Sequence, residues 1–344
     1  MAQNIDIESF DSELRDSLLR IGRLTVAVRC LTAVVYSAVL CWFVYCFYTS
    51  FWGWRGESMQ SESAWIYIAS AFILFLVLNF LLMYCLTTLQ ERKTQIMRKA
   101  VHSRFPDAVY SPKGTIPRTI LQKSLLFDLF PTDNATVDFT GYGKVTFSDE
   151  SGTTEIYDIG VTSGRISGLL GRLPGIGSLV LLYRYIVRPI FGAPIESTMH
   201  SFRGMFGTHT YSTGCKGSVI LLPDRLESNI GYLAHSIQAF RHRNGASHII
   251  LEDVDFERFF AVYADNEIEA RKILTPATMQ RITNLRHAFG RELFISFSED
   301  KVYYAVQFSG GFLRPSRKSL KDAKLFEQIF YELSLGRRCF GSRL

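Results

Sequence analysis

Residues 255–308, "DFERFFAVYADNEIEARKILTPATMQRITNLRHAFGRELFISFSEDKVYYAVQF", combine strand and helix signals in one continuous stretch. The apolar run Phe256–Tyr263 predicts a strand. Asn266 and Glu269 resemble a capping pair, which predicts a short helix directly after them. The segments ELFISFS and KVYYAVQF, joined by a tight turn at Glu299–Asp300, predict a β-hairpin.

A second helix is predicted between the short helix and the hairpin. Thr275 is its expected N-cap, and Pro276 follows at the first helical position, where a missing N–H costs nothing. Gly290 is the expected C-terminal stop. Its buried face is predicted from helical spacing and consists of Met279, Ile282, Leu285 and Phe289.

Further strand patterns lie towards the N-terminus. Residues 135–161 alternate apolar and polar side chains around Gly and Asp turns, which predicts two or three antiparallel strands. Residues 200–224 predict another hairpin, closed by Pro223, and residues 321–335 an amphipathic helix. We therefore expect an α+β fold with a mainly antiparallel sheet and flanking helices.

Three segments of this region are similar to a known family: "FERFFAVYADNEIEARKILTPATMQRITNL", "ISFSEDKVYYAV" and "FRGMFGTHTYSTGCKGSVILLPD". They resemble the bacterial domain-of-unknown-function 3137 family over roughly residues 100–335, most strongly after residue 200. The resemblance implies two N-terminal membrane helices and one cytoplasmic domain. It implies no activity and no catalytic residues, because none is established for the family.

Two long uncharged stretches precede the α+β region, at residues 30–52 and 65–89. Each exceeds the roughly 20 apolar residues that cross a bilayer as a helix. The acid-rich residues 1–29 before the first stretch, and the second stretch after it, argue against a cleavable signal peptide. We expect a transmembrane hairpin at 30–89.

Lys and Arg residues predict its orientation, since cytoplasmic flanks are richer in them. Four arginines precede the first span and the connecting loop holds only Arg55, whereas Arg92, Lys93, Arg98 and Lys99 follow the second span. The expected protein is therefore a multi-pass protein of the bacterial inner (cytoplasmic) membrane, with cytoplasmic N- and C-termini. Residues 1–29 form a cytoplasmic arm, and residues 90–344 a cytoplasmic domain.

An apolar, Arg/Gly-rich insertion is expected at 163–195. It contains Arg165, Arg172, Arg184 and Arg188 and no acid, and its most apolar part, 178–191, is too short and too charged for a normal crossing. A helix lying in the headgroup zone and a helix packed on the soluble core both fit its pattern, with a re-entrant or spanning segment as a third alternative.

The N-terminal arm has apolar residues at helical spacing and a largely acidic opposite face. That face argues against docking on anionic lipid and favours a partner helix or the protein's own domain. A plain helical lead-in to the first span is the alternative. Within the second span, Asn79 can hydrogen-bond to the first helix or to another copy, which would give a homo-oligomer.

The net charge of +6 at pH 7 comes with no recognition helix or stacking aromatics beside the basic stretches, so no nucleic-acid partner is expected. Anionic headgroups and an unidentified protein partner are the expected contacts of the arginines and lysines at 92, 93, 98, 99, 165, 172, 184 and 188.

No catalytic motif is evident, and no metal or cofactor is predicted. His200, His209 and Cys215 fall in one predicted hairpin, but a lone Cys near histidines is a common accident of composition. Three acids at a helix start, Asp265, Glu267 and Glu269, are interpreted as helix-terminal residues rather than as metal ligands.

The sequence thus predicts a non-enzymatic, membrane-anchored interaction or scaffold module. Two alternatives remain open: a membrane-tethered enzyme acting on lipid or nucleotide, with His200, His209 or Cys215 in a pocket, and a ligand sensor that signals through the helices.

Overall fold

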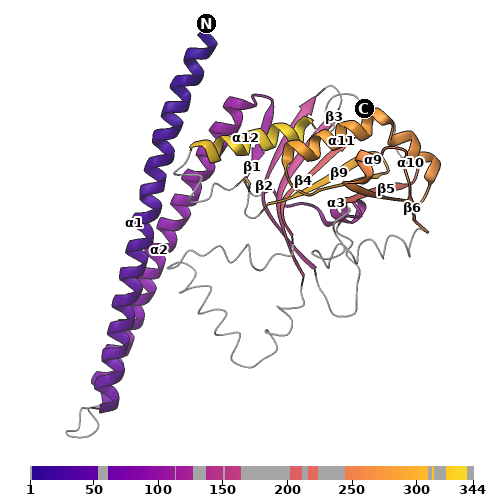
Figure 1. Ribbon diagram of the computed structural model, residues 1–344. Coiled ribbons are helices and arrows are strands. Elements are labelled where there is room, and N and C mark those ends of the chain that lie inside the picture. Colours follow the sequence, from indigo (N-terminus) through magenta and orange to yellow (C-terminus); the bar gives the residue numbers. More distant parts are fainter. Residues whose placement is uncertain are drawn as a thin grey trace. The chain divides into compact units, whose positions relative to one another are not determined.

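A computed structural model describes residues 2–52, 61–112, 114–126, 137–149, 152–163, 202–210, 216–223, 245–308, 312–313 and 323–338. The chain divides into two compact units. The first contains the helices up to Ile96, and the second contains the last turns of the second helix and the whole β-sheet (Figure 1).

The first unit contains α1, Ala2–Trp52, and most of α2, Ser61–Arg104. Among the described residues, Leu19–Trp42 is the stretch that is long and apolar enough to cross a membrane, and it begins earlier than the predicted Cys30. The second predicted span, 65–89, is helical within α2, but many of its side chains lie outside the described residues.

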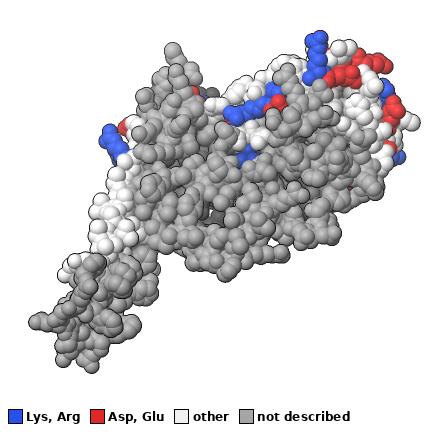
Figure 2. Space-filling view, turned by 60° about the horizontal axis from the view of Figure 1, so that its bottom comes forward, with Lys and Arg blue, Asp and Glu red and all other residues white. Residues whose placement is uncertain are grey.

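Large apolar side chains are exposed along both long helices. On α1, Val34 is 62% and Leu40 64% exposed, and on α2, Phe80 is 74% exposed. Figure 2 shows the described part of these helices as an uncharged band that ends at charged side chains. Contiguous apolar surface of this extent is unfavourable in water and marks a surface that contacts lipid or protein.

The second unit is built on a nine-stranded antiparallel sheet in the described residues, with the order β1-β2-β3-β4-β9-β8-β5-β7-β6. Its strands are β1 Ala108–Ser111, β2 Val137–Asp149, β3 Gly152–Ser163, β4 Phe202–Thr210, β5 Ser218–Pro223, β6 Ser247–Ile249, β7 Phe260–Ala264, β8 Leu293–Ser298 and β9 Lys301–Gln307. Its helices are α3 Arg118–Lys123, α9 Val254–Glu257, α10 Glu267–Ile273, α11 Pro276–Phe289 and α12 Ala323–Arg338. The predicted α+β class with an antiparallel sheet is confirmed.

The strands predicted within 135–161 are confirmed as the paired strands β2 and β3. The hairpin predicted at 200–224 is wrong. Its two strands exist as β4 and β5, but β4 pairs with β3 and β9, whereas β5 pairs with β8 and β7. The β8–β9 hairpin inserts between them, and no local signal in 200–224 encodes that long-range pairing.

The caps predicted within 255–308 are confirmed. The Asn266 side chain accepts hydrogen bonds from the N–H groups of Ile268 and Glu269, and the Thr275 side chain accepts from Thr278 N–H. Gly290 ends α11 with φ +60°, a left-handed conformation that favours glycine. The predicted buried face of α11 is buried throughout.

The strand predicted at Phe256–Tyr263 needs correction. The structure has the short helix α9 at Val254–Glu257, followed by the strand β7 from Phe260. The Asp253 side chain caps α9 by accepting from Asp255 N–H and Phe256 N–H. The apolar run alone cannot distinguish a helical turn from the start of a strand, and the capping aspartate is the signal that decides between them.

Both faces of the sheet are covered (Figure 1). The segment around α3 packs Leu121 and Leu126 against Tyr157, Phe206 and other residues of one face. On the other face, α12 approaches closely. Its Gly336 carbonyl accepts a hydrogen bond of 2.9 Å from the Tyr304 hydroxyl.

The last turns of α2 belong to this second core. Met97, Ala100 and Val101 are each 1% exposed. Immediately after the helix, Phe105 packs edge-on against Phe147 of β2, with ring centroids 5.4 Å apart. The continuous helix α2 therefore ends inside the sheet unit and forms part of its core.

A buried ion pair joins two neighbouring strands. Arg203 on β4 is 5% exposed, and its Nη1 donates to Asp158 Oδ1 on β3 and to the Ile159 carbonyl. The other oxygen of Asp158 accepts from Leu313 N–H at 3.1 Å, and the Arg203 guanidinium lies 3.7 Å from the Tyr142 ring centroid. Each buried charge is thus satisfied by its partner and by further hydrogen bonds.

We expect Arg203→Met to destabilise the sheet unit strongly, because it leaves the Asp158 carboxylate buried and unpaired. Removing one partner of a buried pair costs about 3–5 kcal/mol, and for a unit of this size that lowers Tm by roughly 10 °C. Thermal unfolding of the full chain in mild detergent measures the change. Lys123→Gln, which breaks an exposed pair with Glu299, is the matched control and should leave Tm almost unchanged. Equal shifts for the two variants would contradict the structural role of the buried pair.

Candidate functional site

The cations that follow the second predicted span form a basic flank, defined as Arg92, Lys93, Arg98 and Lys99. All four lie on α2. Arg92, Arg98 and Lys99 are exposed, and Lys93 is half-buried. At 3.6 residues per turn, Arg92 and Lys99 point away from the face on which Met97, Ala100 and Val101 are buried.

The other predicted contact residues lie outside the described part of the structure. They are Arg165, Arg172, Arg184 and Arg188 of the insertion. Asn79 lies on α2, but its side chain is outside the described residues. The structure therefore places the basic flank and leaves the contacts of the insertion and of Asn79 as predictions.

His209 is the one residue of the predicted His/Cys group that the structure describes, because His200 and Cys215 lie outside the described ranges. His209 is 5% exposed and shares a hydrogen bond of 2.8 Å with the Thr154 hydroxyl through its Nδ1. Burial lowers the pKa of this imidazole, Asp149 opposes the shift, and Arg281 adds to it. The side chain is enclosed by the protein, which is typical of a histidine with a structural role.

No group of three His, Cys, Asp or Glu side chains that could hold a metal ion occurs in the described part of the chain. The acids at the start of α10 have specific partners. Asp265 accepts from Ser218 N–H at 2.8 Å, Glu267 pairs with Arg271 at 2.9 Å, and the Glu269 carboxylate pairs with Lys272 at 2.7 Å. The hydrogen bond from Lys272 lowers the pKa of Glu269.

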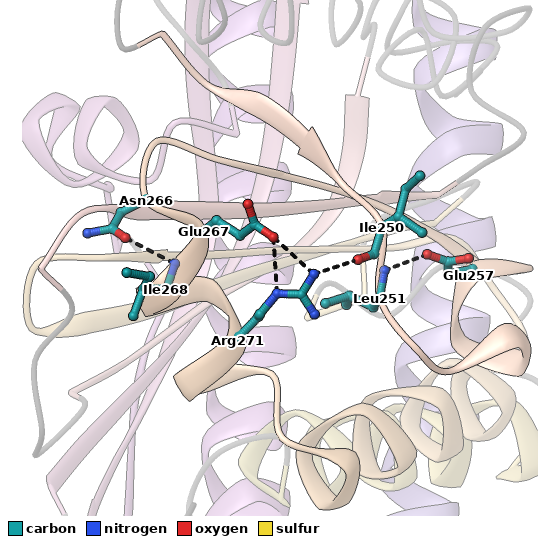
Figure 3. Close-up of polar contacts among 7 residues, drawn as sticks. All are labelled: Ile250, Leu251, Glu257, Asn266, Glu267, Ile268 and Arg271. Carbon is teal, nitrogen blue, oxygen red and sulfur yellow. Dashed lines mark hydrogen bonds and ion pairs between the residues drawn. The ribbon is translucent and has the colours of Figure 1, made fainter.

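Figure 3 shows what the family-like segment does around α10. Arg271 donates to Glu267, one turn earlier, and to the carbonyl of Ile250 at 3.2 Å. In the same segment, which connects β6 to α9, Leu251 N–H donates to Glu257 Oε1 at 2.7 Å. These bonds satisfy backbone groups that follow the edge strand β6, and they fix this segment to α10 through Arg271 and to α9 through Glu257.

The same region carries exposed aliphatic side chains that the sequence patterns did not single out. Ile250, Val254 and Ile268 are 68%, 67% and 68% exposed. Val254 lies between two aspartates and Ile268 between two glutamates. An aliphatic residue between acids in the first turn of a helix is the signal that could have identified Val254 and Ile268.

The pH dependence of stability tests the buried state of His209. Its pKa in the folded chain lies below the value of about 6.5 in the unfolded chain, so the unfolded state binds the proton more readily. The free energy of unfolding should therefore fall as pH decreases below about 6.5. Denaturant unfolding at pH 7.5 and 5.5 should show a smaller fall for His209→Asn than for the unchanged chain. Equal falls in the free energy of unfolding for the two chains would mean that His209 takes up its proton in the folded state as readily as in the unfolded state.

Comparison with known proteins finds a family match for part of the chain. The family described as "Protein of unknown function (DUF3137)" matches residues 200–338, and no curated protein matches the sequence. Among solved structures, the chain is similar to the crystal structure of the mycobacterial trehalose monomycolate transport factor A, TtfA. The identity is 9% and the TM-score 0.35, over 70% of this chain and 94% of that chain. Likeness at that level supports no inference about fold or function.

The matched residues contain the strands from β4 to β9, the helices from α9 to α12, and the three segments on which the resemblance rests. The predicted resemblance is confirmed over residues 200–338, which match the model of the DUF3137 family.

Proposed function

We propose that the chain is a non-enzymatic interaction module anchored in the bacterial inner membrane, which contacts anionic headgroups through its basic flank. The observation that carries the proposal is the position of this flank on α2. It follows a stretch with exposed apolar side chains, such as Phe80 at 74%, and reaches the turn whose opposite face, with Met97 and Ala100, is buried in the sheet unit.

The spacing along α2 suits the headgroup layer. At 1.5 Å per residue, Arg92 lies about 5 Å and Lys99 about 15 Å beyond Leu89, where the apolar stretch ends. The headgroup zone on each side of the hydrocarbon is roughly 5–8 Å thick. Arg92 and Lys93 thus fall within that zone. Arg98 and Lys99 fall within one further Debye length, about 8 Å at physiological salt.

The proposed topology has two crossings, formed by α1 and α2, with the connecting loop outside and both ends of the chain in the cytoplasm. The exposed apolar side chains of both helices support it, and so does the bias of Lys and Arg towards the flanks. In this arrangement Arg165, Arg172, Arg184 and Arg188 lie on the cytoplasmic side with the basic flank, where they bind lipid or a partner protein.

The non-enzymatic role is supported by the partners of three buried side chains that the structure describes. Arg203 and Asp158 neutralise each other, and His209 is enclosed beside Thr154. A general base or a nucleophile must reach its substrate directly or through one water, and these enclosed side chains have structural partners instead.

The lipid contact is tested with the full chain reconstituted into bilayers that carry spin-labelled phosphatidylglycerol or spin-labelled phosphatidylcholine. Electron paramagnetic resonance gives the fraction of each lipid that the protein immobilises. We expect the unchanged chain to prefer the anionic lipid. Each cation near an anionic surface contributes about 1 kcal/mol. The variant Arg92→Gln/Lys93→Gln/Arg98→Gln/Lys99→Gln should therefore lose most of this preference, by about fivefold or more.

The matched control removes four exposed cations of the sheet unit, through Arg118→Gln/Lys123→Gln/Arg258→Gln/Lys272→Gln. It should keep the preference for phosphatidylglycerol. Equal immobilisation of the two lipids by the unchanged chain, or equal loss in the two variants, would contradict headgroup recognition by the basic flank.

A further inference from the structure

A surface groove of about 460 Å³ lies along α11 and reaches the end of α12. Two cations line it, Arg281 on α11 and Arg338 at the last residue of α12, together with the amides of Gln280 and Asn284. None of the described residues that line it is an acid. Guanidinium and amide groups together recognise carboxylates, so this lining suits an anionic polypeptide segment.

Arg281 is held in place for such a role. Its Nη2 donates a hydrogen bond of 3.1 Å to the Arg338 carbonyl, which keeps the guanidinium at the end of α12. The side chain is half-buried, and Arg338 is exposed. A guanidinium that is positioned before binding loses less side-chain entropy when a carboxylate binds to it.

The shape of the groove suits a helix. The α11 residues that line the groove share one helical face. Ala277 lies at one end of this face and Ala288 at the other, and the buried Leu285 forms the floor. Small side chains let a second helix approach, as in ridge-into-groove packing. With 14 residues, α11 is about 21 Å long, which accommodates roughly four turns of a partner.

The chain contains a segment of complementary chemistry, the start of the N-terminal arm. Four acids, Asp6, Glu8, Asp11 and Glu13, precede the first cation, Arg15. Three apolar residues at helical spacing, Ile7, Phe10 and Leu14, give the same segment an apolar face. The backbone of this segment belongs to α1, which begins at Ala2.

We infer that the α11–α12 groove binds the acidic arm of a second copy of this chain, so that neighbouring copies associate on the cytoplasmic side. The inference rests on the proposed topology, which puts arm and groove in one compartment. Helix lengths support the reach between copies. The arm extends about 25 Å before Leu19, and α2 extends about 22 Å beyond Leu89.

Disulfide cross-linking between two differently tagged full-length copies in native membranes tests the contact. The six native cysteines are first replaced by serine. One copy then carries Glu13→Cys and the other Asn284→Cys. Mild oxidation should give a dimer that bears both tags. The matched control replaces Asn284→Cys by Lys272→Cys, on exposed α10, and should give at least fivefold less dimer.

A charge variant tests the recognition itself. Arg281→Gln/Arg338→Gln in the groove copy should lower the cross-linked dimer at least fivefold, with Tm unchanged within a few degrees. Arg258→Gln/Lys272→Gln should leave the yield as it was. Equal yields for Asn284→Cys and Lys272→Cys, no dimer, or a link that forms only within one chain would overturn the inference.

Labelling of Glu13→Cys separates this inference from the proposed function. A membrane-impermeant thiol reagent that reacts with it in intact cells would contradict the topology on which both rest. When the reagent reacts only after the cells are opened, a missing dimer removes the second-copy contact and leaves the proposed anchoring and headgroup contact in place.

Discussion

The structure depends on the continuity of α2, which runs without a break from Ser61 to Arg104. Its last turns are core residues of the sheet unit: Met97 and Val101 are each 1% exposed. No separate linker therefore connects the apolar part of the helix to the sheet. Directly after the helix, Phe105 packs edge-on against Phe147 of β2.

Local signals predicted the second half of the fold well. Around α10 and α11, the caps Asn266 and Thr275 and the left-handed Gly290 each act within a few residues of their own position, so the sequence alone reveals them. The error at Phe256 has the same local character, since the cap that marks the helical turn, Asp253, lies only three residues before it. The error in pairing β4 with β5 has a different cause. Which strands become neighbours depends on β8 and β9, which lie far along the chain.

The residues of the candidate site and its surroundings likewise differ in whether the sequence predicts them. The basic flank was predictable because a run of cations after an apolar stretch is visible in the sequence. The structure adds the face of α2 on which Arg92 and Lys99 lie, which is opposite the buried Met97 and Val101. The buried pair Arg203–Asp158 was not predictable. It joins adjacent strands and is completed by Leu313 N–H, and only the assembled sheet brings these groups together. The groove between α11 and α12 arises in the same way, from Arg281 and Arg338.

The most direct measurement is the compartment of three single cysteines in the full chain, with the native cysteines replaced. They are Ser58→Cys in the loop between α1 and α2, Lys99→Cys in the basic flank and Lys272→Cys on α10. A membrane-impermeant thiol reagent should label Ser58→Cys in intact spheroplasts, and Lys99→Cys and Lys272→Cys only in inverted vesicles. Labelling of Lys99→Cys or Lys272→Cys from outside, or of all three from one side, would contradict a membrane hairpin with a cytoplasmic sheet unit.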